Sequence, residues 1–278
     1  MPWNERAKKL YDRPGMADVG RWLAETSLSQ QMLAPRAVSM FTTQQKWLLA
    51  HIAASLYFRS ITDKTERLTM QTFVRVAVDH KVASRNTAKE FLFHLLKYNF
   101  GDPQIHFKDI QHASAIDLSG QPTEETFVNL SAWYMAHLHA LDKLDGKART
   151  SRFTTNSMRC MALMEPAVTE AFLTCPGIRN PEPAYALFSW ADEGGLIDRF
   201  ITGIADDADL STARLPINVR SITELAQGFN LSRVHTARLI SKAEEIGAVG
   251  WTGRRGHSPM WISRRFHEGY LQFQAVKM

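Results

Sequence analysis

The chain has 278 residues, of which 45% are apolar and 22% charged, and its formal net charge is +5. This balance is that of an ordinary soluble globular protein and excludes a disordered one. The apolar runs are too short for a membrane-spanning helix, and the N-terminus lacks the apolar core of a secretory signal. Cys160 and Cys175 are spaced too far apart along a predicted helix to form a disulfide bond. We therefore expect a cytoplasmic protein with room for two domains.

The first two thirds of the chain are predicted to be mostly helical. Apolar residues recur at helical spacing in residues 16–33, 42–60, 69–78, 84–99, 131–144 and 155–174. Residues 101–129 lack this spacing and contain Asp-Pro and Gly-Gln-Pro, so strands and a long loop are expected there. Asn-Pro-Glu-Pro at 180–183 predicts a domain junction, and one helix is expected over residues 184–205.

Charge is unevenly distributed towards the C-terminus. Residues 211–278 hold ten Lys and Arg against four Asp and Glu, whereas residues 176–210 hold two against seven. A basic C-terminal block is the electrostatic pattern expected of a nucleic-acid-binding domain. A basic face that serves only solubility is the alternative.

Residues 221–251 have the pattern of two helices joined by a tight turn. Ser221 and Glu224 form a capping box that begins the first helix. Ala226 is small enough to let a second helix cross closely. Asn230 suits the positive φ that the turn requires, and Leu231 fills the turn.

The second helix and a following hairpin extend this pattern. Ser232 is placed to cap the helix and Gly247 to end it. Its inward stripe is expected to consist of Thr236, Leu239, Ile240, Ala243 and Ile246. Residues 249–252 and 260–262 read as strands on either side of the basic turn GRRGHSP. The succession resembles the winged helix-turn-helix of bacterial transcription regulators, including the MarR-like group, over about fifty residues that end near Tyr270.

The resemblance implies that the second helix enters the DNA major groove while the wing lies along the backbone or in the minor groove. Residues expected to contact DNA from this module are Ser232, Arg233, Val234, Ala237, Arg238, Lys242, Arg254, Arg255 and His257. Arg233 and Arg238 can each pair with a guanine edge through two hydrogen bonds, or hold a phosphate. The alternative is a helix that only packs in a helical domain, with its arginines solvated.

A fainter copy of the pattern lies 149 residues earlier, where Ala77 aligns with Ala226 and Val82 with Leu231. Its hairpin is expected to be longer and to end at residues 128–131. The residues that this copy would offer to DNA are Ser84, Arg85, Asn86 and Lys89, with His106 and Lys108 from its wing. Leu92 and Phe93 stand where the later copy has Ser241 and Lys242, so a degenerate module used for packing or partner binding is the alternative.

The predicted fold is mainly α with short β-hairpin wings, built from tandem winged helix-turn-helix domains linked by helices. We expect four parts along the chain. They are an N-terminal helical extension (1–38), a first winged-helix-like domain (39–150), a helical linker region (151–210) and a C-terminal DNA-binding domain (211–278).

The sequence offers no motif of an enzyme. Glycine motifs for nucleotides are absent, and His137 and His139 are two residues apart, so they point to different sides of a helix. Asp206, Asp207 and Asp209 lack the glycine and glutamate of a calcium loop. We therefore expect no catalysis, no cofactor and no metal ion.

The leading hypothesis is a sequence-specific regulator of transcription that binds double-stranded DNA, with repression as the first expectation. One alternative is a plasmid or phage replication initiator, because such proteins also resemble two winged helices in one chain. Another is a winged-helix scaffold for protein interactions. A homodimer formed through apolar stripes of residues 16–33 and 155–174, and control by a small-molecule effector, are further expectations.

Overall fold

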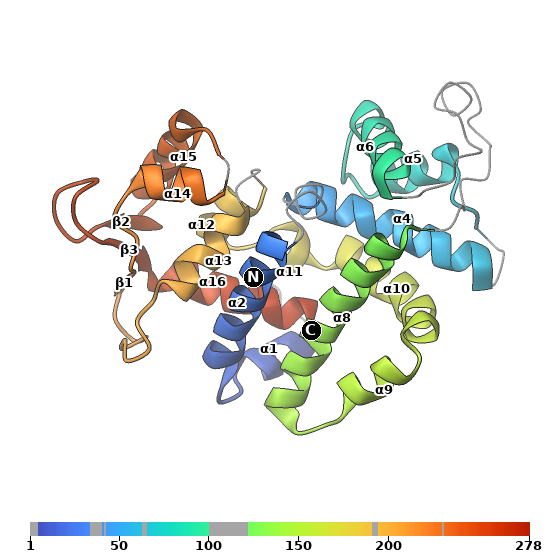
Figure 1. Ribbon diagram of the computed structural model, residues 1–278, viewed down its shortest axis with the longest axis horizontal. Coiled ribbons are helices and arrows are strands. Elements are labelled where there is room, and N and C mark those ends of the chain that lie inside the picture. Colours follow the sequence, from blue (N-terminus) through green and yellow to red (C-terminus); the bar gives the residue numbers. More distant parts are fainter. Residues whose placement is uncertain are drawn as a thin grey trace.

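The computed structural model describes residues 5–33, 41, 43–62, 66–99, 122–190, 194–229 and 231–278. Most of these residues are helical (Figure 1). The N-terminal helices are α1 (Glu5–Tyr11), α2 (Met16–Leu33), α4 (Gln44–Thr62), α5 (Met70–Asp79) and α6 (Arg85–Asn99). The middle helices are α8 (Glu124–Asp145), α9 (Arg149–Thr155), α10 (Ser157–Thr174), α11 (Pro176–Arg179), α12 (Pro183–Ser189) and α13 (Gly194–Thr202). The C-terminal helices are α14 (Ile222–Gly228), α15 (Arg233–Glu245) and α16 (Arg264–Lys277).

The strands of the described residues form one small antiparallel sheet. They are β1 (Arg214–Pro216), β2 (Val249–Trp251) and β3 (Met260–Ser263), in the order β1-β3-β2. Leu215 pairs with Ile262, which in turn pairs with Val249, and these three side chains are buried together. A mainly helical protein with a short β-hairpin is therefore confirmed.

Most helices predicted from apolar spacing are confirmed, with ends shifted by a few residues. The predicted helix over residues 16–33 is α2, and α4, α5 and α6 lie within the other predicted segments or close to them. Local caps explain the agreement at α5. The Thr69 side chain accepts a hydrogen bond from the Thr72 backbone N–H, and the Thr72 side chain accepts one from the Thr69 backbone N–H. In the segment 155–174, the helix begins at Ser157, because Asn156 caps α10 through the N–H of Arg159.

The strand predicted to end the first hairpin at residues 128–131 is wrong, because these residues lie inside α8. Thr123 caps this helix by accepting a hydrogen bond from the Thr126 N–H. Two glutamates in the first turn also stabilise the helix, because their negative charge lies at the positive end of its dipole. Phe127, Leu130 and Tyr134 then follow at helical spacing. His106 and Lys108, expected in the same hairpin, lie outside the described residues.

The single helix predicted over residues 184–205 is also wrong, because the chain forms α12 and then α13. Trp190 ends α12, and a glycine pair begins α13. At Gly195 an added Cβ would lie 2.8 Å from side-chain atoms of Gln31 and Phe229. Close packing against α2 and the end of α14 therefore requires glycine there and sets α13 in a new direction.

The two helix pairs α5–α6 and α14–α15 lie towards opposite ends of the molecule's long axis, while α16 runs from the sheet to the middle (Figure 1). The Tyr270 hydroxyl of α16 donates to the Gly20 carbonyl oxygen of α2 at 3.0 Å. One hydrophobic core extends from Ala7 to Ala275 and includes residues of both helix pairs. The division into four parts stays a prediction. Among the described helices, none combines the length and the apolar character that crossing a membrane requires.

The apolar stripes expected to pair two chains are largely used inside this one. α2 buries Val19 and Leu23, and α10 buries Met161, Phe172 and Leu173. The large hydrophobic side chains that these helices expose are few. They are Met32 and Leu33 at the end of α2, and Met158 and Leu163 on α10. Self-association stays a prediction, to which these large exposed side chains could contribute apolar area.

Because two histidines are buried in the folded protein, we predict that acid destabilises the fold. Burial, with the nearby charge of Lys277, lowers the pKa of His137 to about 3, and burial, with Arg21, lowers that of His267 to about 4. Both imidazoles are thus neutral in the folded protein, whereas in the unfolded chain they bind protons below about pH 6.5. The unfolded state then holds more protons than the folded state, so stability falls as the pH drops below 6.5.

We expect the free energy of unfolding in urea to fall by up to about 1.4 kcal/mol per pH unit for each of these histidines between pH 6.5 and pH 5. The variant His137→Gln should lose its share of this slope. His139, two residues along α8 and half-buried, gives the control variant His139→Gln, which should keep the slope. An unchanged slope in His137→Gln would contradict a neutral buried imidazole.

Candidate nucleic-acid interface

The turn between α14 and α15 is built from a cap, a small residue and one backbone bond. Ser221 caps α14, and its side chain accepts from the N–H groups of Thr223 and Glu224. Ala226 is buried, and its helix packs against α15, as the small side chain predicted. The N–H of Leu231 donates to the Ala226 carbonyl oxygen at 2.8 Å and closes the turn. Asn230, predicted to have positive φ, lies outside the described residues.

The inner side of α15 matches the predicted stripe except at its end. The inward side chains that are buried are Thr236, Leu239, Ile240 and Ala243. Ile246, however, is 54% exposed, because it follows the last helical residue and Gly247, with φ +67°, turns the chain away. Ser232 occupies the N-cap position but makes no side-chain capping bond. No side-chain capping bond from Ser232 therefore reaches the first N–H groups of α15.

The outer face of the N-terminal half of α15 is basic and open. Ser232, Arg233, Val234 and Arg238 are exposed, whereas Ala237, also predicted to face outward, is half-buried. Within the described part of the chain, neither arginine makes an ion pair or a side-chain hydrogen bond. Val234 is 61% exposed, so an apolar side chain lies on the same turn as Arg233. This face offers two free guanidinium groups and one apolar contact.

The C-terminal half of α15 faces a neighbouring helix. Lys242 is exposed but lines a shallow groove together with Leu187 and Trp190 of α12. A long straight ligand on α15 would therefore meet α12 at this end. Among the predicted contacts of α15, Lys242 is the one that the structure does not bring together with Arg233.

The hairpin after α15 carries its charge on an exposed tip. Gly250 allows Trp261 to lie across the sheet, since an added Cβ would come within 2.3 Å of the indole ring. Arg254 and His257 are exposed in the eight residues between β2 and β3. The tip turns at Gly256, whose φ is +75°.

Arg255, the other predicted arginine of the tip, bends back onto α15. Its guanidinium lies 3.0 Å from the Glu244 carboxylate and donates to the Ser241 hydroxyl at 2.8 Å. It thus fixes the hairpin against the helix instead of pointing outward with Arg254. The role of Glu244, the next-to-last residue of α15, could not be predicted from the sequence, because only the folded hairpin brings Arg255 to it.

The first helix pair closes its turn in the same way, 149 residues earlier. The N–H of Val82 donates to the Ala77 carbonyl oxygen at 2.8 Å, the bond that Leu231 makes to Ala226. Lys81 takes the positive φ, 53°, at the position equivalent to Asn230. The outer face of this pair has Ser84, Arg85 and Asn86 exposed and Lys89 half-buried.

Of the two uses expected for a degenerate first module, packing or partner binding, Leu92 serves packing within the chain. This side chain is fully buried in the core of the same chain, and Phe93 is half-buried against it. The helix α6 packs there against α4 and α5, so the position is filled from within. These residues therefore give little support to pairing with a second chain.

Arg179 links the first helix pair to the centre of the molecule, a part that sequence reasoning missed. From α11 its guanidinium donates to the carbonyl oxygens of His80 and Lys81, at 3.0 and 2.9 Å. The same residue lines the groove between α12 and α15. The turn of one helix pair is thus held by a residue that borders the other.

Comparison of the chain with protein-family models, with curated proteins and with solved structures finds no match. In the described residues, no three His, Cys, Asp or Glu side chains gather as metal ligands would.

Proposed function

We propose that this chain is a sequence-specific, double-stranded-DNA-binding regulator of transcription, in which α14, α15 and the β2–β3 hairpin form a winged helix-turn-helix. The observation that carries the proposal is the pair of free arginines, Arg233 and Arg238, on the open half of α15. The exposed Arg254 lies on the hairpin that follows. In this assignment α15 enters the major groove and the hairpin runs along the phosphate backbone.

In this proposal α15 both recognises DNA bases and binds the phosphate backbone. Each arginine can donate two parallel N–H bonds to O6 and N7 of guanine, and Val234 can contact a thymine methyl group. The open N-terminus of α15 at Ser232 suits a phosphate, because its N–H groups and the helix dipole both favour an anion. Specificity is then concentrated in about one and a half turns of helix.

The proposal extends to a second module formed by α5 and α6, with Arg85 and Asn86 as its exposed contacts. The two helix pairs share their turn-closing bond and lie towards opposite ends of the molecule (Figure 1). A single chain could thus hold two separated stretches of one duplex. This tandem arrangement also favours a replication initiator as the second candidate. Sites at promoters support the regulator, and direct repeats at an origin support the initiator.

Salt dependence tests DNA binding itself. Phosphate contacts release condensed counterions, so the affinity falls with salt at a slope of about −0.9 per contact. With roughly four phosphate contacts, we expect the affinity for duplex DNA to drop by about 100-fold or more between 50 and 200 mM salt. Fluorescence anisotropy with a labelled duplex measures this. A dissociation constant that does not change over this range would overturn the proposal.

A further inference from the structure

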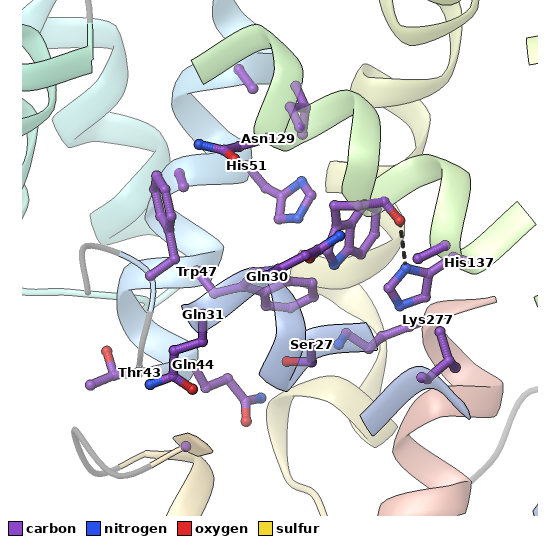
Figure 2. Close-up of a pocket in the computed structure, with 18 of the residues that line it drawn as sticks. Ser27, Gln30, Gln31, Thr43, Gln44, Trp47, His51, Asn129, His137 and Lys277 are labelled. Atoms are coloured by element: carbon purple, nitrogen blue, oxygen red, sulfur yellow. Dashed lines mark hydrogen bonds between the residues drawn. The ribbon is translucent and has the colours of Figure 1, made fainter. Parts of the chain in front are cut away.

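A cavity of about 340 Å³ lies in the middle of the molecule, between α2, α4, α8, α13 and α16 (Figure 2). This volume falls within the range of small-molecule sites in proteins. The cavity is separate from the outer face of α15 and from the hairpin tip, since none of their residues line it. It is therefore a second candidate site, and the proposed DNA contacts do not involve its residues.

Three large rings form its apolar wall: Trp47 of α4, Trp133 of α8 and Phe273 of α16. The ring centroid of Trp47 lies 6.2 Å from that of Trp133 and 6.4 Å from that of Phe273. Such rings favour another aromatic ring, packed against a face or an edge. The wall thus selects a ligand with a flat aromatic part.

Buried polar atoms in the cavity wall have no partner within the described protein. They include Nε2 of His137 and Oε1 of Gln274, on side chains that are 8% and 6% exposed. The Nδ1 atom of His137 lies 2.8 Å from the Trp133 carbonyl oxygen, which can only accept, so Nδ1 carries the proton and Nε2 is an acceptor. The Gln274 side chain lies within hydrogen-bonding reach of His137. Two acceptors therefore face each other, and a hydrogen-bond donor on the ligand would satisfy both.

One positive and one negative side chain also line the cavity, Lys277 of α16 and Asp198 of α13. The Lys277 ammonium lies 5.3 Å from the ring centre of Trp47 and 5.4 Å from that of Phe273, and Figure 2 shows it reaching towards Ser27. Burial raises the pKa of Asp198, which also accepts a hydrogen bond from Ser27, and burial lowers the pKa of Lys277. The two charges also stabilise each other, since Lys277 lowers the pKa of Asp198 and Asp198 raises that of Lys277. The site is thus balanced in charge, and a ligand without net charge suits it better than a simple ion.

We propose that this cavity binds an aromatic amino acid or a closely related zwitterion. The ring packs among Trp47, Trp133 and Phe273, the carboxylate pairs with Lys277, and the ammonium donates to Asp198 and to the acceptors of His137 and Gln274. A simple anion would leave the Asp198 charge facing it, and a simple cation would face Lys277. A zwitterion matches each with its opposite and adds no net charge to a buried site.

The cavity also borders the supports of both helix pairs. α4 packs against α5 and α6, and α16 follows directly on β3 of the hairpin. We infer that the ligand is an effector, a step that rests on the proposed DNA binding. A ligand that binds more tightly to one placement of the two helix pairs shifts the protein towards it.

Calorimetric titration of the full chain, without DNA, tests the site. The probes are L-tryptophan, L-tyrosine and L-phenylalanine, with indole-3-propionate and tryptamine as analogues of tryptophan that lack the ammonium or the carboxylate. We expect at least one amino acid to bind. If that is tryptophan, each analogue should bind at least tenfold more weakly, and for the other two their own deaminated and decarboxylated analogues serve. Absence of binding by all three amino acids, or equal binding of the analogues, would overturn the proposal.

Variants test which side chain of the cavity recognises the carboxylate of the ligand and which recognises its ammonium group. Lys277→Met should abolish the preference for the amino acid over its decarboxylated analogue, and Asp198→Asn the preference over its deaminated analogue. Lys147→Met, at an exposed lysine in the loop before α9, is the control and should change neither. If a cavity variant fails to fold, the analogue comparison on the unaltered chain still decides.

The same ligand is then added to the DNA titration. We expect the affinity for DNA to change by about fivefold or more, in the usual range of coupling between two sites. A ligand that binds in calorimetry but leaves DNA affinity unchanged would keep the site and overturn its role as effector site. Because the calorimetry contains no DNA, its failure would leave the proposed DNA binding untouched.

Discussion

Replacing both Arg233 and Arg238 with alanine should remove most of the preference for the recognised sequence over random DNA. Both guanidinium groups are exposed on the open half of α15 and are not held by any described residue. A guanidinium bound to a guanine by two hydrogen bonds contributes roughly 1–3 kcal/mol of discrimination. Each single variant should thus lose roughly 5- to 150-fold in affinity for the recognised duplex, and much less for random DNA.

The matched control is the hairpin arginine Arg254, replaced with alanine alone. This variant should bind all sequences more weakly to a similar extent and should reduce the salt slope by about one unit, as expected for a phosphate contact. Arg255→Ala acts differently, because its side chain ties the hairpin to Glu244 and Ser241. Competition anisotropy with specific and random duplexes separates these effects. Identical losses in the helix and hairpin variants would contradict the division of roles.

Replacing Glu165 with alanine should lower the free energy of unfolding by roughly 3–5 kcal/mol. Glu165 is 0% exposed and lies on α10, where its carboxyl group meets side chains of two other helices. His51 Nδ1 of α4 lies 2.7 Å from Oε1, the Tyr134 hydroxyl of α8 donates to Oε2, and the Thr169 hydroxyl donates to Oε1. Removing the carboxyl group leaves the His51 imidazole and the Tyr134 hydroxyl buried without this acceptor, whereas the Thr169 hydroxyl keeps its bond to the His51 carbonyl oxygen.

Urea unfolding of Glu165→Ala and Glu170→Ala measures this difference on the same helix. Glu170 is exposed, so its removal should change stability by less than about 0.5 kcal/mol. Glu165→Gln keeps the shape and one acceptor and should fall between the two. If Glu165→Ala were as stable as Glu170→Ala, the buried network would not hold α4, α8 and α10 together.

Elements governed by neighbouring residues could be predicted from the sequence. Ser221 begins α14, Gly247 ends the turn after α15, and the alternation around Trp251 gives a strand, all through contacts within a few residues. The start of α8 differs from the prediction because Asp-Pro and Gly-Gln-Pro favour a loop up to residue 129, whereas Thr123 caps a helix that begins at Glu124. Helix and strand ends can therefore be predicted where capping or turn residues lie next to them in the sequence.

Features that join distant residues could not be predicted. Arg255 reads as a free charge in its tip, and only the folded hairpin brings it to Glu244. The cavity needs Trp47, Trp133 and Lys277, which are far apart along the chain and meet through the packing of three helices. No periodicity encodes such a meeting. The exposed face of α15, in contrast, followed from helical phase alone, with Ile246 and Ala237 as the residues that it misplaced.

Selection from random duplexes shows whether this protein reads a DNA sequence through α15. The full chain is incubated with the duplexes at physiological salt, and those retained over several rounds are sequenced. We expect convergence on a common sequence with guanines that Arg233 and Arg238 recognise, and loss of that convergence in the double alanine variant. Retained duplexes without a shared sequence, or no retention at all, would contradict it.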